Sequence, residues 1–367
     1  MKVLGIETSC DETAVAVVEI DERTKVCRML SNTIVSQIDI HAAYGGVVPE
    51  VAARSHIEAM TPTLDESINI AFPELKNASA KEKVAGVDAI AVTYGAGLGG
   101  SLLIGVMAAR TLAIASGKPL YALNHVEGHV YANFITETTL PGYYLPPEAP
   151  KFPILTLIVS GKHSQLVLFR DHFDYTLLGS AQDDAIGEAF DKVARMTGLP
   201  YPGGPSVAKA AMIGNPHAFQ LPKSKVEGDY NFSFSGLKTA VLRLGQSLVG
   251  ADYRLPSFEL PGRLSEAQKA DIAASFQRIA IETVVDKTVK AFEEFSPASV
   301  VIAGGVASSQ ELRKQLSDRI PMQVNYTDPK LCTDNGAMIA TLGCFKALLG
   351  ADKADPYSLE INPSLKM

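Results

Sequence analysis

The sequence predicts an α/β fold that is duplicated into two lobes, and three observations lead to this prediction. The chain has 367 residues, more than the roughly 250–300 at which a single hydrophobic core stops growing. A pattern of two strands around a polar turn occurs at residues 2–20 and again at 154–169. A strand, a glycine-rich loop and a helix follow at 87–116 and again at 298–317. Such a duplication predicts a nucleotide-sized cleft between the two halves.

The first half is expected to contain, in order, strands at 2–8 and 14–20, a helix at about 50–69, a strand at 87–93 and a helix at 102–116. The polar turn from Ser9 to Thr13 joins the first two strands and carries hydroxyl and carboxylate groups. The last of these helices stops at Gly117, a residue type that often ends helices.

The second half is expected to contain strands at 154–159, 165–169 and 298–303, and helices at 183–197, 265–295, 310–317 and 335–349. Five prolines between residues 139 and 153 exclude a helix or a central strand there. We therefore expect four parts: a first lobe at 1–138 completed by the helix at about 331–350, a crossing at 139–153, a second lobe with helical insertions at 151–330, and a tail at 351–367.

Composition narrows the function classes. The chain is 47% hydrophobic and 20% charged, which is ordinary for a globular protein. We find no apolar run of the ~18–20 residues that cross a bilayer, and Glu7 stands where a signal peptide keeps its apolar segment. These features predict a cytoplasmic protein without a membrane partner. With a net charge of −7, a nucleic-acid partner must bind a local basic patch or be recruited by other subunits.

Two histidines four residues apart predict a metal site. His125 and His129 follow an apolar strand-like run, and on a helix they lie one turn apart on the same face. Zinc proteases place a glutamate directly after the first histidine, whereas Glu127 comes two residues later and faces away, at ~200° around the helix. Peptide hydrolysis of that type is therefore disfavoured.

Asp334 is the best candidate for a third ligand, because it lies in a turn of small residues where a second helix begins. Two imidazoles and one carboxylate suit Fe(II), Zn(II) or Mn(II) and leave coordination positions for substrate oxygens. The alternative is that Asp334 only caps the helix that starts at Asn335.

Three glycine loops, at 95–100, 203–204 and 304–305, precede helices. Backbone NH groups at helix N-termini commonly bind phosphate. None of the loops matches the P-loop or the GxGxxG pattern, so they indicate either a nucleotide site or tight turns. Asp191, on the helix expected at 183–197, could bond a ribose or be a solvated acid.

Taken together, eight motifs resemble the TsaD family of tRNA threonylcarbamoyladenosine transferases, and the resemblance covers nearly the whole chain. The motifs are Ile6 to Thr13, Gly45 to Glu50 with Ala53, Arg54 and His56, Asn124 to His129, Val159 to Gly161, Gly187 to Lys192, Tyr201 to Pro205, Phe234 to Thr239 and Cys332 to Met338.

The resemblance implies an actin-like, Hsp70-like ATPase fold. It also implies the reaction, in which the threonylcarbamoyl group of threonylcarbamoyl-AMP passes to the exocyclic amine of the adenosine just 3′ of the anticodon, in tRNAs that read codons beginning with A. The partners implied are tRNA, a TsaB-like paralogue of the same fold and a small TsaE-like ATPase. The ligands implied are one divalent metal ion, Fe(2+) or Zn(2+), and threonylcarbamoyl-AMP or an ATP-type nucleotide.

Site residues carry over position by position. By resemblance His125, His129 and Asp334 are the metal ligands, and Asp11 is the carboxylate to test for activity. The positions that match the family's adenylate site are Ile158, Val159, Ser160, Gly161, Lys162, Asp191, Gly204 and Ser309.

Three positions depart from the family's pattern. Lys162 replaces its second glycine after Val-Ser-Gly, Ser309 replaces an asparagine, and Ala96 stands where proline is common. Lys162 adds a cation and bulk beside a phosphate-binding turn, and Ser309 has a shorter reach than asparagine. These changes bear on nucleotide affinity more than on the reaction class.

The chemistry expected is acyl transfer, in which a bound metal positions the threonylcarbamoyl group and polarises its carbonyl. Asp11 is expected to accept the proton of the attacking amine. The alternatives are an ATP-dependent kinase or chaperone of the same fold, which needs a carboxylate and Mg²⁺ at the phosphates, or a nucleotide-binding scaffold without chemistry.

Overall fold

The computed structural model describes the backbone of residues 1–367 and every side chain except that of residue 80. The chain forms two compact units. Unit 1 consists of residues 1–150 and 326–367, and unit 2 consists of residues 151–325. The C-terminal part of the chain therefore returns to the unit in which the chain begins.

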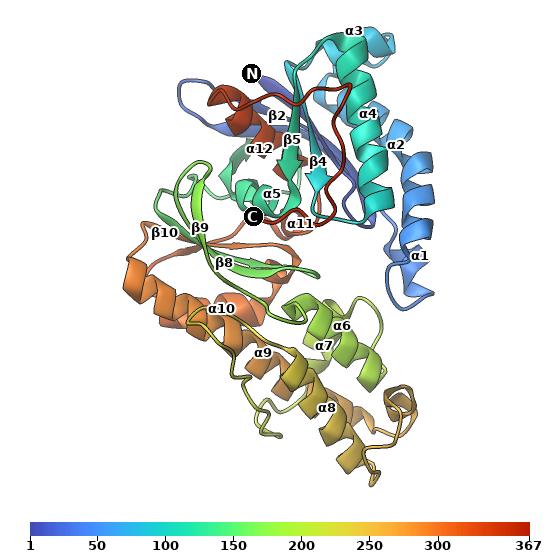
Figure 1. The fold of residues 1–367 in the computed structure, drawn as a ribbon, viewed down its shortest axis with the longest axis vertical. Coiled ribbons are helices and arrows are strands. Elements are labelled where there is room, and N and C mark those ends of the chain that lie inside the picture. The colour runs from blue at the N-terminus through green and yellow to red at the C-terminus, as the bar shows by residue number, and fades with distance from the viewer. The chain divides into compact units, whose positions relative to one another are not determined.

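Unit 1 is built on a mixed sheet with the strand order β5-β4-β1-β2-β3-β6; β2, β4 and β5 are labelled in Figure 1. Strands β1, β2 and β3 form an antiparallel meander, and β4 and β5 extend it in parallel from β1. The strands are β1 (Lys2–Glu7), β2 (Glu12–Ile20), β3 (Cys27–Ser36), β4 (Ala89–Gly95), β5 (Leu120–Asn124) and β6 (Ile135–Thr138). The helices are α1 (Ile38–Ala42), α2 (Pro49–Ala71), α3 (Ala80–Ala85), α4 (Gly99–Ser116), α5 (His125–Tyr131), α11 (Pro329–Cys332) and α12 (Gly336–Leu348), with 3-10 turns at Pro73–Leu75 and Ala132–Phe134.

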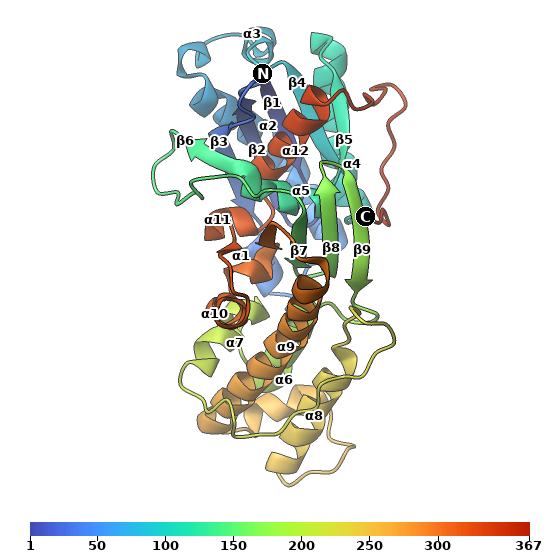
Figure 2. The same ribbon diagram turned by 90° about the vertical axis from the view of Figure 1, so that its left-hand side faces the viewer.

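Unit 2 has a second mixed sheet with the strand order β11-β10-β7-β8-β9; β7, β8 and β9 are visible in Figure 2. Its strands are β7 (Ile154–Val159), β8 (Ser164–Asp171), β9 (Asp174–Ser180), β10 (Ser299–Ala303) and β11 (Val324–Asn325). The helices are α6 (Ile186–Thr197), α7 (Gly203–Ala211), α8 (Ser235–Leu248), α9 (Glu266–Phe295) and α10 (Gln310–Arg319), with 3-10 turns at Ser257–Gly262 and Gly305–Ser308.

The two sheets repeat one topology. In each, an antiparallel meander of three strands is followed by two strands that add in parallel on the side of the first strand. The prediction of a duplicated, actin-like α/β fold is therefore confirmed. The third strand of each meander, β3 and β9, was missing from the prediction. Only one residue of β9 is buried, and β3 contains the polar run Ser31 to Thr33, so neither segment has the continuous apolar pattern that predicts a strand.

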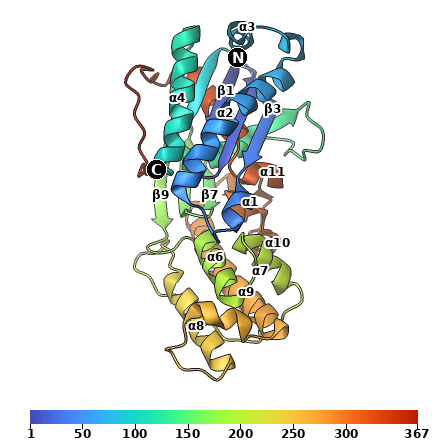
Figure 3. The same cartoon turned by 90° about the vertical axis from the view of Figure 1, so that its right-hand side faces the viewer.

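Helices cover both faces of the sheet of unit 1. Successive side chains of a strand point to opposite faces, and those of Leu4 and Ile6 join a core with Met60 of α2 and Val106 of α4. Gly5 lies between them and faces the other way, where an added Cβ would meet the backbone of α12. Helices α2 and α4 run side by side on the first face (Figure 3).

Helix α4 corrects one expectation from the sequence. By length and composition it is apolar enough to cross a membrane, so the statement that no apolar segment reaches this length is wrong. One such helix is weak evidence for a membrane span, because core helices of soluble proteins can be equally long and apolar. Here Leu102 and Val106 are buried, while Leu103 and Met107, ~100° further around the helix, are about half exposed, at 47% and 46%. The helix is apolar on both its inner and its outer side.

Candidate active site

Helix α5 carries both histidines of the predicted metal site. β5 ends at Asn124, whose side-chain oxygen accepts the backbone NH groups of Val126 and Glu127 and so caps the helix at its first turn. The rings of His125 and His129 are buried, with centroids 4.8 Å apart in an edge-to-face arrangement. The strand end and the cap together fix where the two imidazoles point.

Asp334 meets the two histidines from the start of α12. The cap of that helix is Asn335, whose side chain accepts the NH of Met338 at 2.9 Å, so the reading of Asp334 as the helix cap is wrong. Its Oδ1 lies 3.5 Å from Nε2 of His125 and 3.3 Å from Nε2 of His129. One ligand atom from each of the three residues falls within 4.8 Å of the others.

The donor set fits a metal ion. The side chain of His129 is buried, and among the described residues neither of its ring nitrogens makes a hydrogen bond; Nε2 has only the 3.3 Å contact with Oδ1 of Asp334. Buried polar atoms are almost always satisfied, so a ligand for Nε2 of His129 accounts for an otherwise costly arrangement. Two imidazole nitrogens with one carboxylate oxygen suit borderline metals and leave coordination positions open.

Glu7 orients His125 and was not among the predicted site residues. Its Oε2 lies 3.2 Å from Nδ1 of His125, and it also accepts the Thr93 hydroxyl; its Oε1 accepts the NH of Ser9 at 2.5 Å. Burial raises the pKa of Glu7, but the charge of His125 and the hydrogen bonds from His125 and Ser9 outweigh it and lower the pKa. A carboxylate on the far nitrogen is the usual partner of a metal-binding histidine. The sequence signal that could have identified Glu7 is an acidic residue at the end of an otherwise apolar strand.

Asp11 lies in the turn between β1 and β2, beside this cluster. Its neighbour Glu12 has a pKa well above the usual range, because of burial and then because of the nearby charges of Asp334 and Asp11. Ser9, in the same turn, has its hydroxyl 3.1 Å from Nδ1 of His125.

Glu127 faces away from the cluster, as the helical spacing predicts. Its Oε1 lies 3.8 Å from Nζ of Lys346 on α12. Burial raises the pKa of Glu127, and the nearby charge of Lys346 partly offsets this. The arrangement differs from that of a zinc protease, in which the glutamate acts at the metal.

In unit 2 the turn after β7, which carries the predicted adenylate residues Ser160, Gly161 and Lys162, lies against the start of α6. The hydroxyl of Ser160 accepts the NH groups of Lys162 and His163, at 3.4 and 3.1 Å, and shapes the turn after β7. The NH of Gly187 donates to the carbonyl of Ser160 at 3.3 Å, which joins α6 to this turn. Gly304 approaches from the loop after β10, where an added Cβ would lie 2.5 Å from the carbonyl of Val159.

The remaining predicted residues of this group have different surroundings. Ile158 and Val159 are fully buried, so only their backbone can face a ligand. Asp191 Oδ1 accepts the NH of Gly203 at 2.7 Å and ties α7 to α6, which differs from a solvated helix acid. Ser309 caps α10, its hydroxyl accepting the NH of Leu312 at 3.4 Å.

Two glycines of this group border open space. A Cβ added at Gly161 or at Gly204 would meet nothing within 4 Å, whereas one added at Gly203 would lie 2.5 Å from the Cα of Asp191. The turn and the start of α7 therefore leave room for a ligand beside Gly161 and Gly204.

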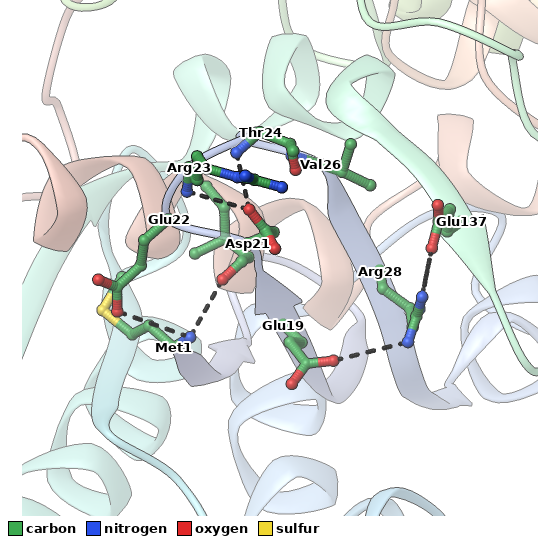
Figure 4. Close-up of a pocket in the computed structure, with 10 residues that line it drawn as sticks. Met1, Glu19, Asp21, Glu22, Arg23, Thr24, Val26, Arg28 and Glu137 are labelled. Atoms are coloured by element: carbon green, nitrogen blue, oxygen red, sulfur yellow. Dashed lines mark hydrogen bonds and ion pairs between the residues drawn. The ribbon is translucent and has the colours of Figure 1, made fainter.

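A surface pocket of about 720 Å³ lies elsewhere, at the end of the β2–β3 hairpin (Figure 4). Arg28 donates to Oε2 of Glu137 through Nε at 2.9 Å and Nη2 at 2.7 Å, and its Nη1 is 3.9 Å from Glu19. Two carboxylates thus already balance the charge of Arg28. The lining consists of residues other than the predicted site residues.

The chain was compared with known proteins. A family model described as TsaD, tRNA N6-adenosine threonylcarbamoyltransferase, matches residues 28–341. Relatives of that name from Thermomicrobium roseum and Dehalococcoides mccartyi are 48% and 43% identical, each aligned over 100% of this chain and over 97% and 99% of their own length. Among solved structures, an activator of 2-hydroxyisocaproyl-CoA dehydratase from Clostridium difficile is similar with a TM-score of 0.47 and 13% identity, over 95% of this chain and 96% of that one. By its sequence match over nearly its whole length, the chain belongs to the TsaD family of tRNA N6-adenosine threonylcarbamoyltransferases.

Proposed function

We propose that this protein is a tRNA N6-adenosine threonylcarbamoyltransferase. It takes the threonylcarbamoyl group from threonylcarbamoyl-AMP and transfers it to the exocyclic amine of the adenosine 3′ of the anticodon in tRNAs that read codons beginning with A. The observation that carries the proposal is the meeting of His125, His129 and Asp334 in a chain whose full-length relatives bear this name.

In this proposal His125, His129 and Asp334 hold one divalent metal ion, Fe(II) or Zn(II). Such an ion, when bound, acts as a template and Lewis acid for the oxygens of the threonylcarbamoyl group. Glu7 orients the ring of His125 through Nδ1, which leaves Nε2 of His125 on the side of Asp334. The buried ring nitrogens of His129 make no hydrogen bond among the described residues, which supports the assignment.

The transfer itself needs a proton acceptor. The adenosine amine attacks the carbamoyl carbon, a C–N bond forms, and the bond from that carbon to the phosphate oxygen breaks to release AMP. Asp11 accepts the amine proton as attack proceeds, because this amine is too weakly acidic to lose its proton beforehand. The turn that carries Asp11 also holds Ser9, whose hydroxyl lies 3.1 Å from Nδ1 of His125, and this place beside the cluster supports Asp11 in the role.

The adenylate part of the donor belongs to unit 2 in this proposal. The room beside Gly161 and Gly204 supports a ligand there. Lys162 is exposed on the same turn, where its ammonium group can form a charge-assisted contact with a phosphate. Asp191 is the residue proposed to contact the ribose.

The protein is proposed to work in the cytoplasm with a TsaB-like paralogue, a TsaE-like ATPase and tRNA. A net charge of −7 disfavours unaided binding of a polyanion. The outer face of α2 and α4 exposes large apolar side chains, which supports a protein partner. They are Ile57, Leu103, Met107 and Ile114.

The deciding experiment combines purified protein, threonylcarbamoyl-AMP and tRNA, with and without the partner proteins, and measures modified adenosine by mass spectrometry. His125→Ala is expected to lower modification by more than ~100-fold, because changing even a partner that orients a metal ligand costs about 10- to 100-fold. Glu127→Gln is the matched control, since it lies on the same helix but faces Lys346. Full activity of a folded His125→Ala protein would contradict the metal role. Nucleotide hydrolysis without tRNA modification would instead favour a kinase-like or chaperone-like ATPase.

A further inference from the structure

The loop and helix that follow β3 contain a buried polar network that the proposed reaction does not use. His41, His56 and Thr13 are fully buried, and Gln37 nearly so. Gln37 precedes α1, and His56 belongs to the motif on α2 that the site described above leaves unexplained. Two buried imidazoles are costly unless they are fully hydrogen-bonded.

The protonated nitrogen of His56 follows from its partners. Nε2 lies 3.0 Å from the carbonyl oxygen of Cys10, which can only accept, so Nε2 carries the proton. In the neutral ring Nδ1 is then an acceptor. It receives the hydroxyl of Thr13 at 2.7 Å and the amide of Gln37 at 3.4 Å.

The same reasoning determines which ring nitrogen of His41 carries the proton. The backbone NH of Val48 donates to Nδ1 at 3.3 Å, so Nε2 carries the proton and donates to Oε1 of Gln37 at 3.1 Å. All the hydrogen bonds therefore run in one direction, from the backbone NH of Val48 through His41, Gln37 and His56 to the carbonyl of Cys10. The chain of bonds is complete with both imidazoles neutral.

The end of this network holds the backbone around Asp11. The carbonyl of Cys10 accepts one hydrogen bond from Nε2 of His56 and another from the hydroxyl of Ser101 at 3.1 Å. The carbonyl of Asp11 accepts the NH of Gln37 at 3.0 Å. The peptide groups on both sides of Asp11 are thus held by residues from α2, α4 and the start of α1.

We propose that His56 is a positioning residue for the acyl transfer, which fixes the turn that carries Asp11 by donating to the carbonyl of Cys10. The inference rests on the proposed function and on Asp11 as proton acceptor. A misplacement of about 1 Å at a reacting group can cost ~100-fold in rate, so loss of this one donor should slow turnover.

The test compares two amides at position 56. In His56→Gln a side-chain NH can still reach the carbonyl of Cys10, whereas the shorter side chain of His56→Asn keeps a polar group near Thr13 and loses that reach. With threonylcarbamoyl-AMP, tRNA and the partner proteins, we expect His56→Asn to lower kcat by ~10- to 100-fold. Its KM and bound metal should stay unchanged, and His56→Gln should keep most of kcat. Ser101→Ala, which removes the other donor to the same carbonyl, should lower kcat by a smaller factor.

A double-mutant cycle separates positioning from general support of the fold. Asp11→Asn should lose ~100- to 10,000-fold, the range of a general base, and adding His56→Asn to it should change kcat by less than ~2-fold. Equal further loss in the double variant, or wild-type kcat in a folded His56→Asn protein, would overturn the inference. Full activity of Asp11→Asn would show that Asp11 is not the proton acceptor, and the inference would fail on that ground. An inactive wild type with all partners present would contradict the proposed function instead.

Discussion

Gly203 and Gly204 are adjacent, but only Gly204 has room for a side chain. We expect Gly203→Ala to lower the free energy of unfolding by about 1–3 kcal/mol, the usual cost of an inserted methyl group in a packed place, because its Cβ would press on Asp191. Gly204→Ala should leave stability unchanged and weaken binding of an ATP-type nucleotide. Thermal unfolding and calorimetric titration of the two variants measure these effects. Unchanged nucleotide affinity in Gly204→Ala would remove that residue from the site.

His56 should make stability depend on pH. Burial lowers its pKa, although the carbonyl of Cys10 and the charges of Glu7 and Asp11 raise it, while the charge of His41 adds to the lowering. The unfolded chain, with a pKa near 6.5, therefore takes up the proton more readily than the folded protein. The contribution of His56 is fully present above pH ~6.5 and is lost as the pH falls through the lower pKa of the folded state.

Denaturant unfolding of the wild type and of His56→Gln from pH 7.5 to 5.5 measures this contribution. The difference in the free energy of unfolding between the two proteins should shift against the wild type as the pH falls. A difference that stays constant over this range would contradict the assignment of a neutral, buried His56.

Sequence reasoning reached His125 and His129 because four-residue spacing on a helix leaves little freedom in where two side chains point. It left Asp334 open, because Asp and Asn are equally good helix caps and only the backbone of the turn decides that Asn335 fills that place. Glu7 was missed for another reason. Its burial depends on β2 and β4 lying on both sides of β1, which the sequence of β1 alone does not state.

Helix α12 carries Asp334 at its start and rests on β1 at a glycine. A Cβ at Gly5 would lie 2.3 Å from the backbone nitrogen of Ala340 and 2.6 Å from the carbonyl oxygen of Gly336. We expect Gly5→Ala to push the helix outward, to cost about 1–3 kcal/mol of stability, and to weaken metal binding because Asp334 moves with the helix. Urea unfolding of the metal-free protein and a metal titration measure the two effects.

Gly262→Ala is the matched control for that experiment, because an added Cβ there meets nothing within 4 Å. It should match the wild type in both measurements. If Gly5→Ala lost stability and kept its metal affinity, the placement of Asp334 would not depend on this contact.

The elements that sequence reasoning found are those with one continuous apolar face or run, such as β1, β7 and α9. It missed β3 and β9, which occupy the same place in the two meanders. In β3 buried and exposed positions alternate over a polar segment, and β9 lies at the edge of its sheet with little burial. Pairing with a neighbouring strand, rather than local composition, makes these segments strands.

The candidate residues for the metal ion and those for the nucleotide belong to different units. His125, His129 and Asp334 all lie in unit 1, and the proposed adenylate residues all lie in unit 2. A ligand stabilises the folded part that binds it, by about 2.7 kcal/mol at a concentration one hundred times Kd. In calorimetry we therefore expect a divalent metal to raise one unfolding transition and an ATP-type nucleotide to raise another. His129→Ala should abolish only the first shift, and Gly204→Ala should reduce only the second. Equal shifts of both transitions by either ligand would contradict this division.

The return of the chain to unit 1 also has a consequence for synthesis on the ribosome. Domains generally fold as they emerge, with N-terminal ones first, but here unit 2 is continuous and complete at residue 325, before α12 has been made. Until α12 is made, unit 1 is incomplete, because the face of β1 around Gly5 is uncovered. The two histidines of α5 also lack Asp334 until then. The nascent protein thus acquires its second unit before its first, and its candidate metal ligands come together only after Asp334 and α12 have been made.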